Sequence, residues 1–178
     1  MEKTINIPNV KVSETFKVAG MEFIKFPEVD GMVSVVMKDI AFRSEFGDNN
    51  DLRTSTVLKK MEKDILPKVI AAIGEENVCT FKTDLTTLCG LKTYGVMESK
   101  ISLYTFDFYR KHVEIFDKYP VDDYCWTATP DSTKPHDDPY WVVCVSPSGG
   151  IISDGYINGR AVRPILFFKS SIFESLEQ

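Results

Sequence analysis

The order in which strand-like and helix-like patterns follow one another constrains the fold of this chain more than any single motif does. Residues 16–29 and 31–40 alternate apolar and polar side chains or are rich in Val, which predicts strands joined by a turn at Gly31. Helical patterns occupy the middle of the chain, and short strand-like segments return after Pro120. Strands, then helices, then clustered strands predict an α+β fold with a mixed or antiparallel sheet rather than alternating β–α–β units.

The main helical pattern runs over residues 55–74, where apolar side chains recur at spacings of three and four. Thr54 or Ser55 can cap its start, and Gly74 can end it. Pro67 interrupts the apolar stripe, which predicts a break or a second short helix near that residue.

The last third of the chain combines aromatic residues with turn residues. A second amphipathic helix is expected before Pro120. Three strand-like segments follow it, with the sequences "YCWTAT", "PYWVVCVSPSGGIIS" and "AVRPILFF", and the second of these predicts a hairpin around "SPSGG". Trp126 and Trp141 are expected to be core residues of these final hairpins.

Length and charge limit the class of protein. The 178 residues predict a single domain over residues 15–178, preceded by residues 1–14 as a polar N-terminal arm. The net charge is −5, and Lys and Arg are scattered among acidic residues, which argues against nucleic-acid binding. No secretory signal or apolar run of membrane-spanning length is visible, so we expect cytoplasmic synthesis in a host cell, with possible virion association, and no membrane partner.

The four cysteines offer no metal-binding or redox motif. None forms a C-x-x-C pair, and the two histidines do not supply zinc-finger spacing. Cys79, Cys89, Cys125 and Cys144 are therefore expected to be reduced and packed as small apolar residues. In an oxidising environment, Cys125 and Cys144 would be the pair to examine.

No catalytic motif or cofactor site is found, so we expect neither an enzyme nor a bound cofactor or metal. His136, Asp137 and Asp138 are adjacent and could offer ligands to a divalent ion, but three neighbouring side chains seldom point at one centre, and a solvated acidic loop is the preferred interpretation. The segment "FGDNNDLR" lacks the rhythm of a calcium loop and predicts a turn before the helix instead.

Aromatic and polar residues of the C-terminal loops are the candidate binding residues. Tyr140 and Tyr156 each neighbour a turn, and Tyr beside Gly, Ser, Asn and Asp is typical of binding loops. Arg160 or Arg163 could bind an anionic ligand, although Arg163 is better explained by a buried ion pair that anchors the last strand. The candidate ligand- or partner-binding residues are Tyr140, Tyr156, Asn158, Arg160, His136 and Asp138.

The order of motifs resembles a family of uncharacterised domains from bacteria and their phages. These motifs are "WTATP", "YWVVCV", "GGII" and "AVRPILFF" near the C-terminus, with "FKVAGMEFIKF", "KDIAFRSEFGDNNDLRTSTVLKKM" and "ISLYTFDFYRKH" upstream. The resemblance covers roughly residues 16–173. It implies a C-type-lectin-like fold, similar to that of formylglycine-generating enzymes, in which the N- and C-terminal strands pair and two main helices lie on the sheet.

The same resemblance implies a binding role. In binding members the ligand-facing loops correspond to residues 131–140 and 146–159 here. The resemblance implies neither catalysis nor calcium, because the cysteine pair and the calcium-binding signatures of related folds are not matched. We therefore expect a non-enzymatic binding module of phage or prophage origin that recognises protein or glycan through its C-terminal loops.

Two other functions are compatible with the same sequence. The chain could be a structural virion component, such as a capsid decoration or tail accessory protein, that forms homo-oligomers or reaches a neighbour through residues 1–14. It could also be a small intracellular inhibitor of a host protein, which its acidic charge allows.

Overall fold

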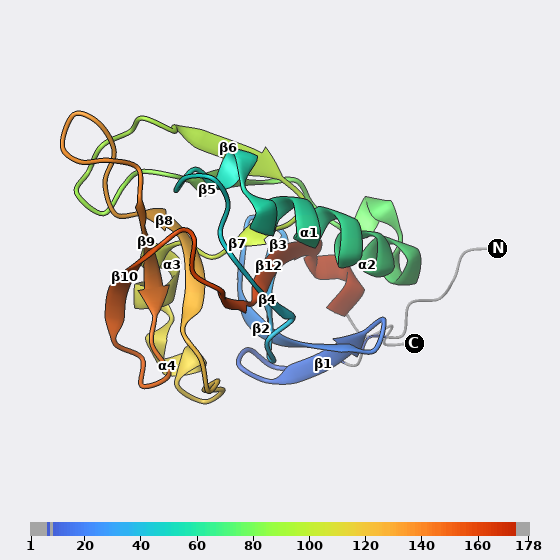
Figure 1. Cartoon of the computed structure of the whole chain (residues 1–178). Coiled ribbons are helices and arrows are strands. Elements are labelled where there is room, and N and C mark those ends of the chain that lie inside the picture. The colour runs from blue at the N-terminus through green and yellow to red at the C-terminus, as the bar shows by residue number, and fades with distance from the viewer. Residues whose placement is uncertain (1–6, 8, 174–178) are drawn as a thin grey trace, which may run out of the picture.

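The computed structural model describes residue 7 and residues 9–173, so half of the expected arm, residues 1–6 and 8, lies outside the described residues. The described chain is α+β, as expected, and is dominated by two five-stranded sheets (Figure 1). A separate hairpin pairs β5 (Phe81–Asp84) with β6 (Val96–Ser99). No helix in the described part is long and apolar enough to cross a membrane.

The first sheet carries both the first and the last strands. In spatial order its strands are β1 (Thr15–Val18), β2 (Met21–Val29), β3 (Met32–Met37), β12 (Pro164–Lys169) and β7 (Ser102–Leu103). The turn between β2 and β3 confirms the predicted hairpin, with Gly31 at φ 76°. The direct pairing expected between the N- and C-terminal strands is wrong, because this hairpin folds β3 back between β2 and β12.

The second sheet is built from the C-terminal half and one N-terminal strand. In spatial order its strands are β10 (Ile151–Gly155), β9 (Trp141–Val145), β8 (Cys125–Pro130), β11 (Arg160–Val162) and β4 (Phe42–Ser44). The hairpin predicted around "SPSGG" is present as β9 and β10. The single strand predicted for "AVRPILFF" is instead two strands in different sheets, and Arg163 is the residue between them.

The main helical segment is broken as the sequence predicts. Helix α1 (Thr56–Asp64) is followed after one residue by α2 (Leu66–Ile73), so the break falls beside Pro67. Ser55 caps α1, because its Oγ accepts a hydrogen bond from the Leu58 backbone N–H at 3.0 Å. Gly74 ends α2 at φ 88°, a conformation that favours glycine.

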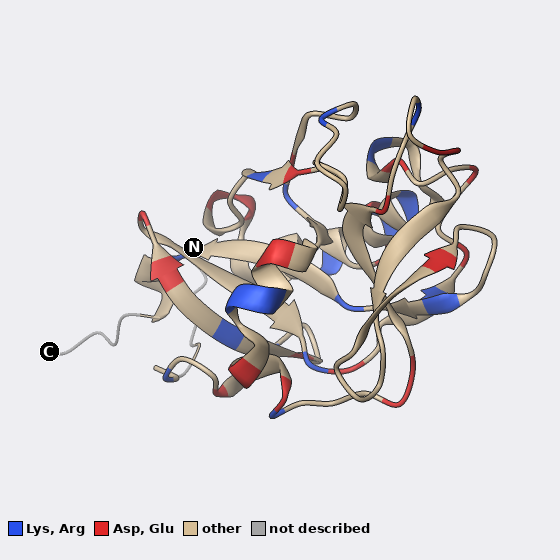
Figure 2. Ribbon diagram, turned by 90° about the vertical axis from the view of Figure 1, so that its left-hand side faces the viewer, with Lys and Arg blue, Asp and Glu red and all other residues tan. Residues whose placement is uncertain are grey.

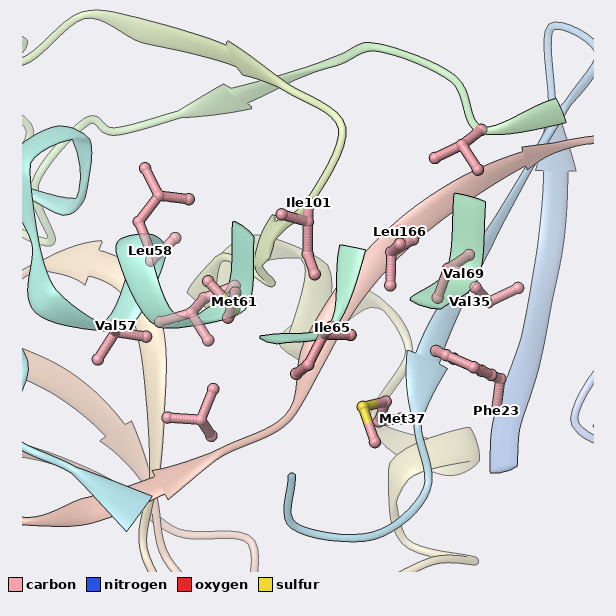
Figure 3. Packing of buried hydrophobic residues seen from close by; sticks show 14 of the residues in the cluster. Phe23, Val35, Met37, Val57, Leu58, Met61, Ile65, Val69, Ile101 and Leu166 are labelled. Carbon is pink, nitrogen blue, oxygen red and sulfur yellow. The ribbon is translucent and has the colours of Figure 1, made fainter. Parts of the chain in front are cut away.

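Helices α1 and α2 cover one face of the first sheet and build the main core (Figure 1). Their apolar stripe places Met61, Ile65 and Val69 toward side chains of the sheet (Figure 3). The same core cluster continues into the second sheet through Trp126, which is fully buried, as expected, and donates its indole N–H to the Ser44 carbonyl at 2.9 Å. One core therefore connects both sheets.

The second helical segment lies against the opposite face of the first sheet. It consists of α3 (Phe106–Lys111), capped by Thr105, and α4 (Val113–Phe116). Tyr109 and Phe116 belong to a second apolar cluster that includes Ile24 and Ile165. Three short 3-10 helices complete the described elements: η1 (Leu52–Thr54), η2 (Glu75–Asn77) and η3 (Ser170–Phe173). Basic and acidic residues are interspersed over the ribbon in the view of Figure 2.

Candidate functional site

An exposed aromatic cluster lies where β9 begins. Trp141 is 41 % exposed, so its expected place in the core is wrong. The cause is its cross-strand partner, Gly155, which has no side chain with which to cover the indole. The Tyr140 ring lies against Gly155 instead, since a Cβ added there would come within 2.6 Å of Tyr140 Cε1. Tyr140 contacts Trp141 and Tyr156 edge-to-face, with centroid distances of 4.7 and 5.2 Å.

Strand β10 forms an open edge of the second sheet, at the left-hand margin of Figure 1. Two backbone hydrogen bonds show which β10 residues turn their N–H and C=O groups toward β9. The Ser146 N–H donates to the Gly150 carbonyl, and the Tyr156 N–H donates to the Tyr140 carbonyl. Because bonded and non-bonded pairs alternate in an antiparallel ladder, the N–H and C=O groups of Ile151 and Ser153 point away from β9. Among the described residues, these groups have no backbone or side-chain partner.

Apolar side chains flank this open edge. Ile151 and Ile152 are 38 % and 39 % exposed, and Ile157 is exposed in the turn after β10. Trp141 and Ile151 belong to the same face of the β9–β10 hairpin, because their cross-strand partners are Gly155 and Val145. We call Tyr140, Trp141, Ile151, Ile152, Ser153, Tyr156 and Ile157 the β10 surface.

Asn158 and Arg160 hold the turn after β10 rather than extending freely into solvent. Both hydrogen-bond the carboxylate of Asp154, Asn158 Nδ2 at 2.7 Å and Arg160 through its Nε. Burial by itself raises the pKa of Asp154, but the hydrogen bonds from Arg160, Asn158 and the Gly155 N–H outweigh it, so the pKa is lowered. This trio fixes the turn that carries Tyr156 and Ile157.

The loops over residues 85–95 and 131–140 lie side by side and bring a cysteine next to a histidine. Cys89 Sγ is 3.6 Å from His136 Nδ1, 3.3 Å from Ser132 Oγ and 3.2 Å from Thr87 Oγ1. Contacts with Ser132, Thr87 and His136, in that order, lower the pKa of the Cys89 thiol to about 7. Cys89 is exposed, so its expected packing as an apolar residue is wrong.

Asp138, Arg163 and the two buried cysteines lie outside the β10 surface. The Asp138 carboxylate pairs with Lys134 at 2.7 Å on the exposed loop, and the Asp138 carbonyl accepts a hydrogen bond from the Tyr140 N–H at 2.8 Å. The buried ion pair expected for Arg163 is wrong, because no carboxylate lies within 4.0 Å of its guanidinium among the described residues. Cys125 and Cys144 are buried, as expected, and no disulfide joins the cysteines.

Asn50 positions the loops and was missed as a functional residue. It is fully buried, and its Nδ2 donates to the carbonyls of Ser132 and Trp141 at 2.8 and 3.0 Å. The Tyr94 hydroxyl donates to Asn50 Oδ1 at 2.6 Å. Asn50 therefore links the loop of Tyr94, the loop after β8 and the start of β9 where Trp141 lies. In the sequence, Asn50 stands in the run of turn residues "GDNND", which predicts a turn. Such a run gives no information about the distant residues that the Asn50 side chain contacts.

Comparisons with protein-family models, curated proteins and solved structures find no match to this chain. Within the described ranges, no group of three or more His, Cys, Asp and Glu side chains is arranged to hold a metal ion.

Proposed function

We propose that this chain is a non-enzymatic binding module that recognises a protein partner through the β10 surface. The observation that carries the proposal is Trp141, an indole 41 % exposed beside an open strand edge. Aromatic side chains at a surface supply large contact area at a small cost in conformational entropy, and Trp and Tyr are enriched at binding hot spots.

The open backbone of β10 favours a polypeptide over a glycan. Ile151 and Ser153 each present an N–H and a C=O group outward, and an added antiparallel or parallel strand satisfies such groups in register. Natural proteins usually protect open edges with charges, Pro or a covering element. Here the flanking residues Ile151 and Ile152 are apolar, which suits the alternating side-chain pockets of strand addition.

The finer description rests on the motif resemblance. We propose a C-type-lectin-like fold and a phage or prophage origin because of the ordered motifs in residues 16–173. The central place of β12 beside the N-terminal hairpin is compatible with this fold, and the β10 surface comes from the segment that the resemblance makes ligand-facing.

The Cys89–His136 pair is the feature that most favours catalysis, and it does not displace the binding proposal. A nucleophile–base pair is normally completed by a third group that orients the base. No described side chain hydrogen-bonds His136 Nε2. The pair also lies on an exposed loop, where water is not excluded.

A displayed library of random peptides tests the proposal. The library is selected on the immobilised protein, and recovered peptides are synthesised and titrated against purified variants. We expect Trp141→Ala and Ser153→Pro each to weaken binding by about tenfold or more. Ser153→Pro removes an outward N–H from the edge strand and no hydrogen bond to β9, so we expect the variant to fold. A far-UV circular dichroism spectrum and a urea midpoint close to those of the wild-type protein would establish this.

The matched control is Val96→Ala, which shortens an exposed apolar side chain on β6, outside the β10 surface. Recovered peptides that bind every variant equally contradict the proposal. Glycan-array signals that disappear in Trp141→Ala, without any recovered peptide, assign the surface to a glycan. Light scattering of the chain with and without residues 1–14 separates the virion-component alternative, which requires an assembly that dissolves on truncation.

A further inference from the structure

A second feature, independent of the β10 surface, is a buried arginine at the junction of the two sheets. Arg163 separates β11 from β12 and is only 4 % exposed. Its Nε donates to the Met37 carbonyl at 3.1 Å, and its guanidinium carbon lies 5.8 Å from the centroid of the Phe116 ring. Arg163 Nη2 is buried and has no hydrogen-bond acceptor among the described residues.

The guanidinium faces a cavity. The cavity has a volume of about 240 Å³, and Arg163 lines it together with residues of α3, α4 and the β9–β10 turn. Its aromatic wall consists of Tyr104, Tyr109, Phe116 and Tyr119. Ser146, Pro147, Ser148 and Gly149 of the β9–β10 turn also line it, and the Tyr109 hydroxyl joins α3 to this turn by donating to the Gly149 carbonyl at 3.0 Å.

The charge of Arg163 is not balanced within this cavity. Asp117 is the one acidic residue on the wall, but it is exposed and forms no ion pair with Arg163 within 4.0 Å. Burial raises the pKa of the nearby Cys125 thiol to about 11, so this thiol is neutral at pH 7 and supplies no counter-charge. A buried cation without a charged partner is costly, which makes an anionic ligand favourable at this position.

We propose that this cavity binds a small organic carboxylate. The carboxylate accepts hydrogen bonds from the guanidinium of Arg163, and the apolar part of the ligand lies against the rings of Tyr109 and Phe116. Guanidinium–carboxylate bonds are charge-assisted and therefore stronger than bonds between neutral groups, and small-molecule sites combine apolar walls with few polar anchors. In the described part of the chain, Arg163 is the one cation that lines this cavity, and a single positive charge matches a monoanion better than it matches phosphate.

The test titrates isotope-labelled protein with benzoate and follows the NMR signals of the Arg163 side chain and the amides of residues 146, 148 and 149. We expect saturable shifts at these positions below about 10 mM benzoate, a range typical of weak small ligands. Benzamide has nearly the same shape without the charge, and we expect its binding to be at least about tenfold weaker. Inorganic phosphate is titrated in a third series.

Each outcome decides the proposal. Benzoate shifts that saturate while benzamide and phosphate produce none support it, and Arg163→Met should then abolish them with the rest of the spectrum unchanged. Absence of shifts with benzoate overturns it. Equal binding of benzoate and benzamide, or binding of phosphate alone, overturns the carboxylate assignment. If Arg163→Met does not fold, the three titrations of the wild-type protein remain decisive.

Discussion

The thiol of Cys89 differs from the other cysteines at neutral pH, because hydroxyl and imidazole groups surround it on an exposed loop. We predict that iodoacetamide alkylates Cys89 with a rate that rises through a midpoint near pH 7, which is the lowered pKa of this thiol. Cys125 and Cys144 stay unmodified in the folded protein, because they are buried and burial raises the pKa of each thiol.

Peptide mass mapping across a pH series measures this rate, with Cys89→Ser as the control. Ser132→Ala should move the midpoint upward, because the contact with Ser132 is the largest cause of the lowered pKa. A midpoint near the ordinary thiol value in the wild-type protein would be incompatible with the loop arrangement described.

Asp154 is a buried carboxylate whose titration should affect stability. Its pKa is lower in the folded chain than in the unfolded chain, so its contribution is fully present at neutral pH and is lost as pH falls through the folded pKa. We predict that Asp154→Asn lowers the free energy of unfolding by about 2 kcal/mol at pH 7, through weakened hydrogen bonds to Arg160 and Asn158.

Urea unfolding at several pH values tests this prediction, and the difference between variant and wild type should shrink below about pH 4. Asp138→Asn, which disrupts an exposed pair with Lys134, is the matched control and should change stability by less than about 1 kcal/mol. A difference for Asp154→Asn that persists unchanged into acid would rule out the ionised carboxylate as its source.

Residue-level expectations failed where exposure depends on a distant partner. Trp141 is a large aromatic residue of the kind usually found in a core. It is exposed because the strand register places it opposite Gly155, which has no side chain. Cys89 and His136 are 47 positions apart, so their contact has no local signature. Tyr140 and Tyr156, in contrast, were identified as binding candidates because turn residues beside Tyr are a local signal, and they do contact each other.

At the scale of single elements, the cap of α1 gives a direct test. Ser55 is buried, and its Oγ bonds both the Leu58 N–H and the Leu52 carbonyl. We predict that Ser55→Ala lowers the free energy of unfolding by about 1–2 kcal/mol. Thr105→Ala, at the cap of the shorter and less buried α3, should cost less. Urea denaturation measures both, and a larger loss for Thr105→Ala would contradict the assignment of α1 as a core helix.

Strand β10 has its own prediction. We expect the amides of Ile151 and Ser153 to exchange with deuterium much faster than those of Ile152 and Asp154, because only the latter face β9. Amide exchange followed by NMR resolves the four signals. The opposite alternation would mean that the register is shifted by one residue and that the open groups of β10 are not those assigned here.

Elements with strong local signals were predictable, and their neighbours in space were not. Ser55, Pro67 and Gly74 mark the start, break and end of α1 and α2 by local chemistry. The division of "AVRPILFF" at Arg163 has one local mark, Pro164, which begins β12, but the β-rich residues on both sides favour one continuous strand. Which sheet each half joins is decided by pairing with β4 and β3, far away in the sequence.

At the scale of the whole molecule, the shared core predicts cooperative unfolding. Trp126 belongs to the second sheet, whereas α1 and α2 lie on the first, yet one apolar cluster contains them all. We predict that Trp126 fluorescence and far-UV circular dichroism give the same urea midpoint. The measurement is made in a Trp141→Phe background, so that the fluorescence comes from Trp126. Separate midpoints would mean that the sheets unfold independently.

The place of β12 has a consequence for how the protein is made. Its pairing partner β3 leaves the ribosome about 130 residues earlier, which corresponds to roughly 6–26 s of translation at 5–20 residues per second. During that interval the edge of β3 that later pairs with β12 has no partner strand, and apart from Ser34 the side chains on both its faces are apolar. We therefore expect a nascent chain that pauses in this window to expose an aggregation-prone strand edge until the last strand is synthesised.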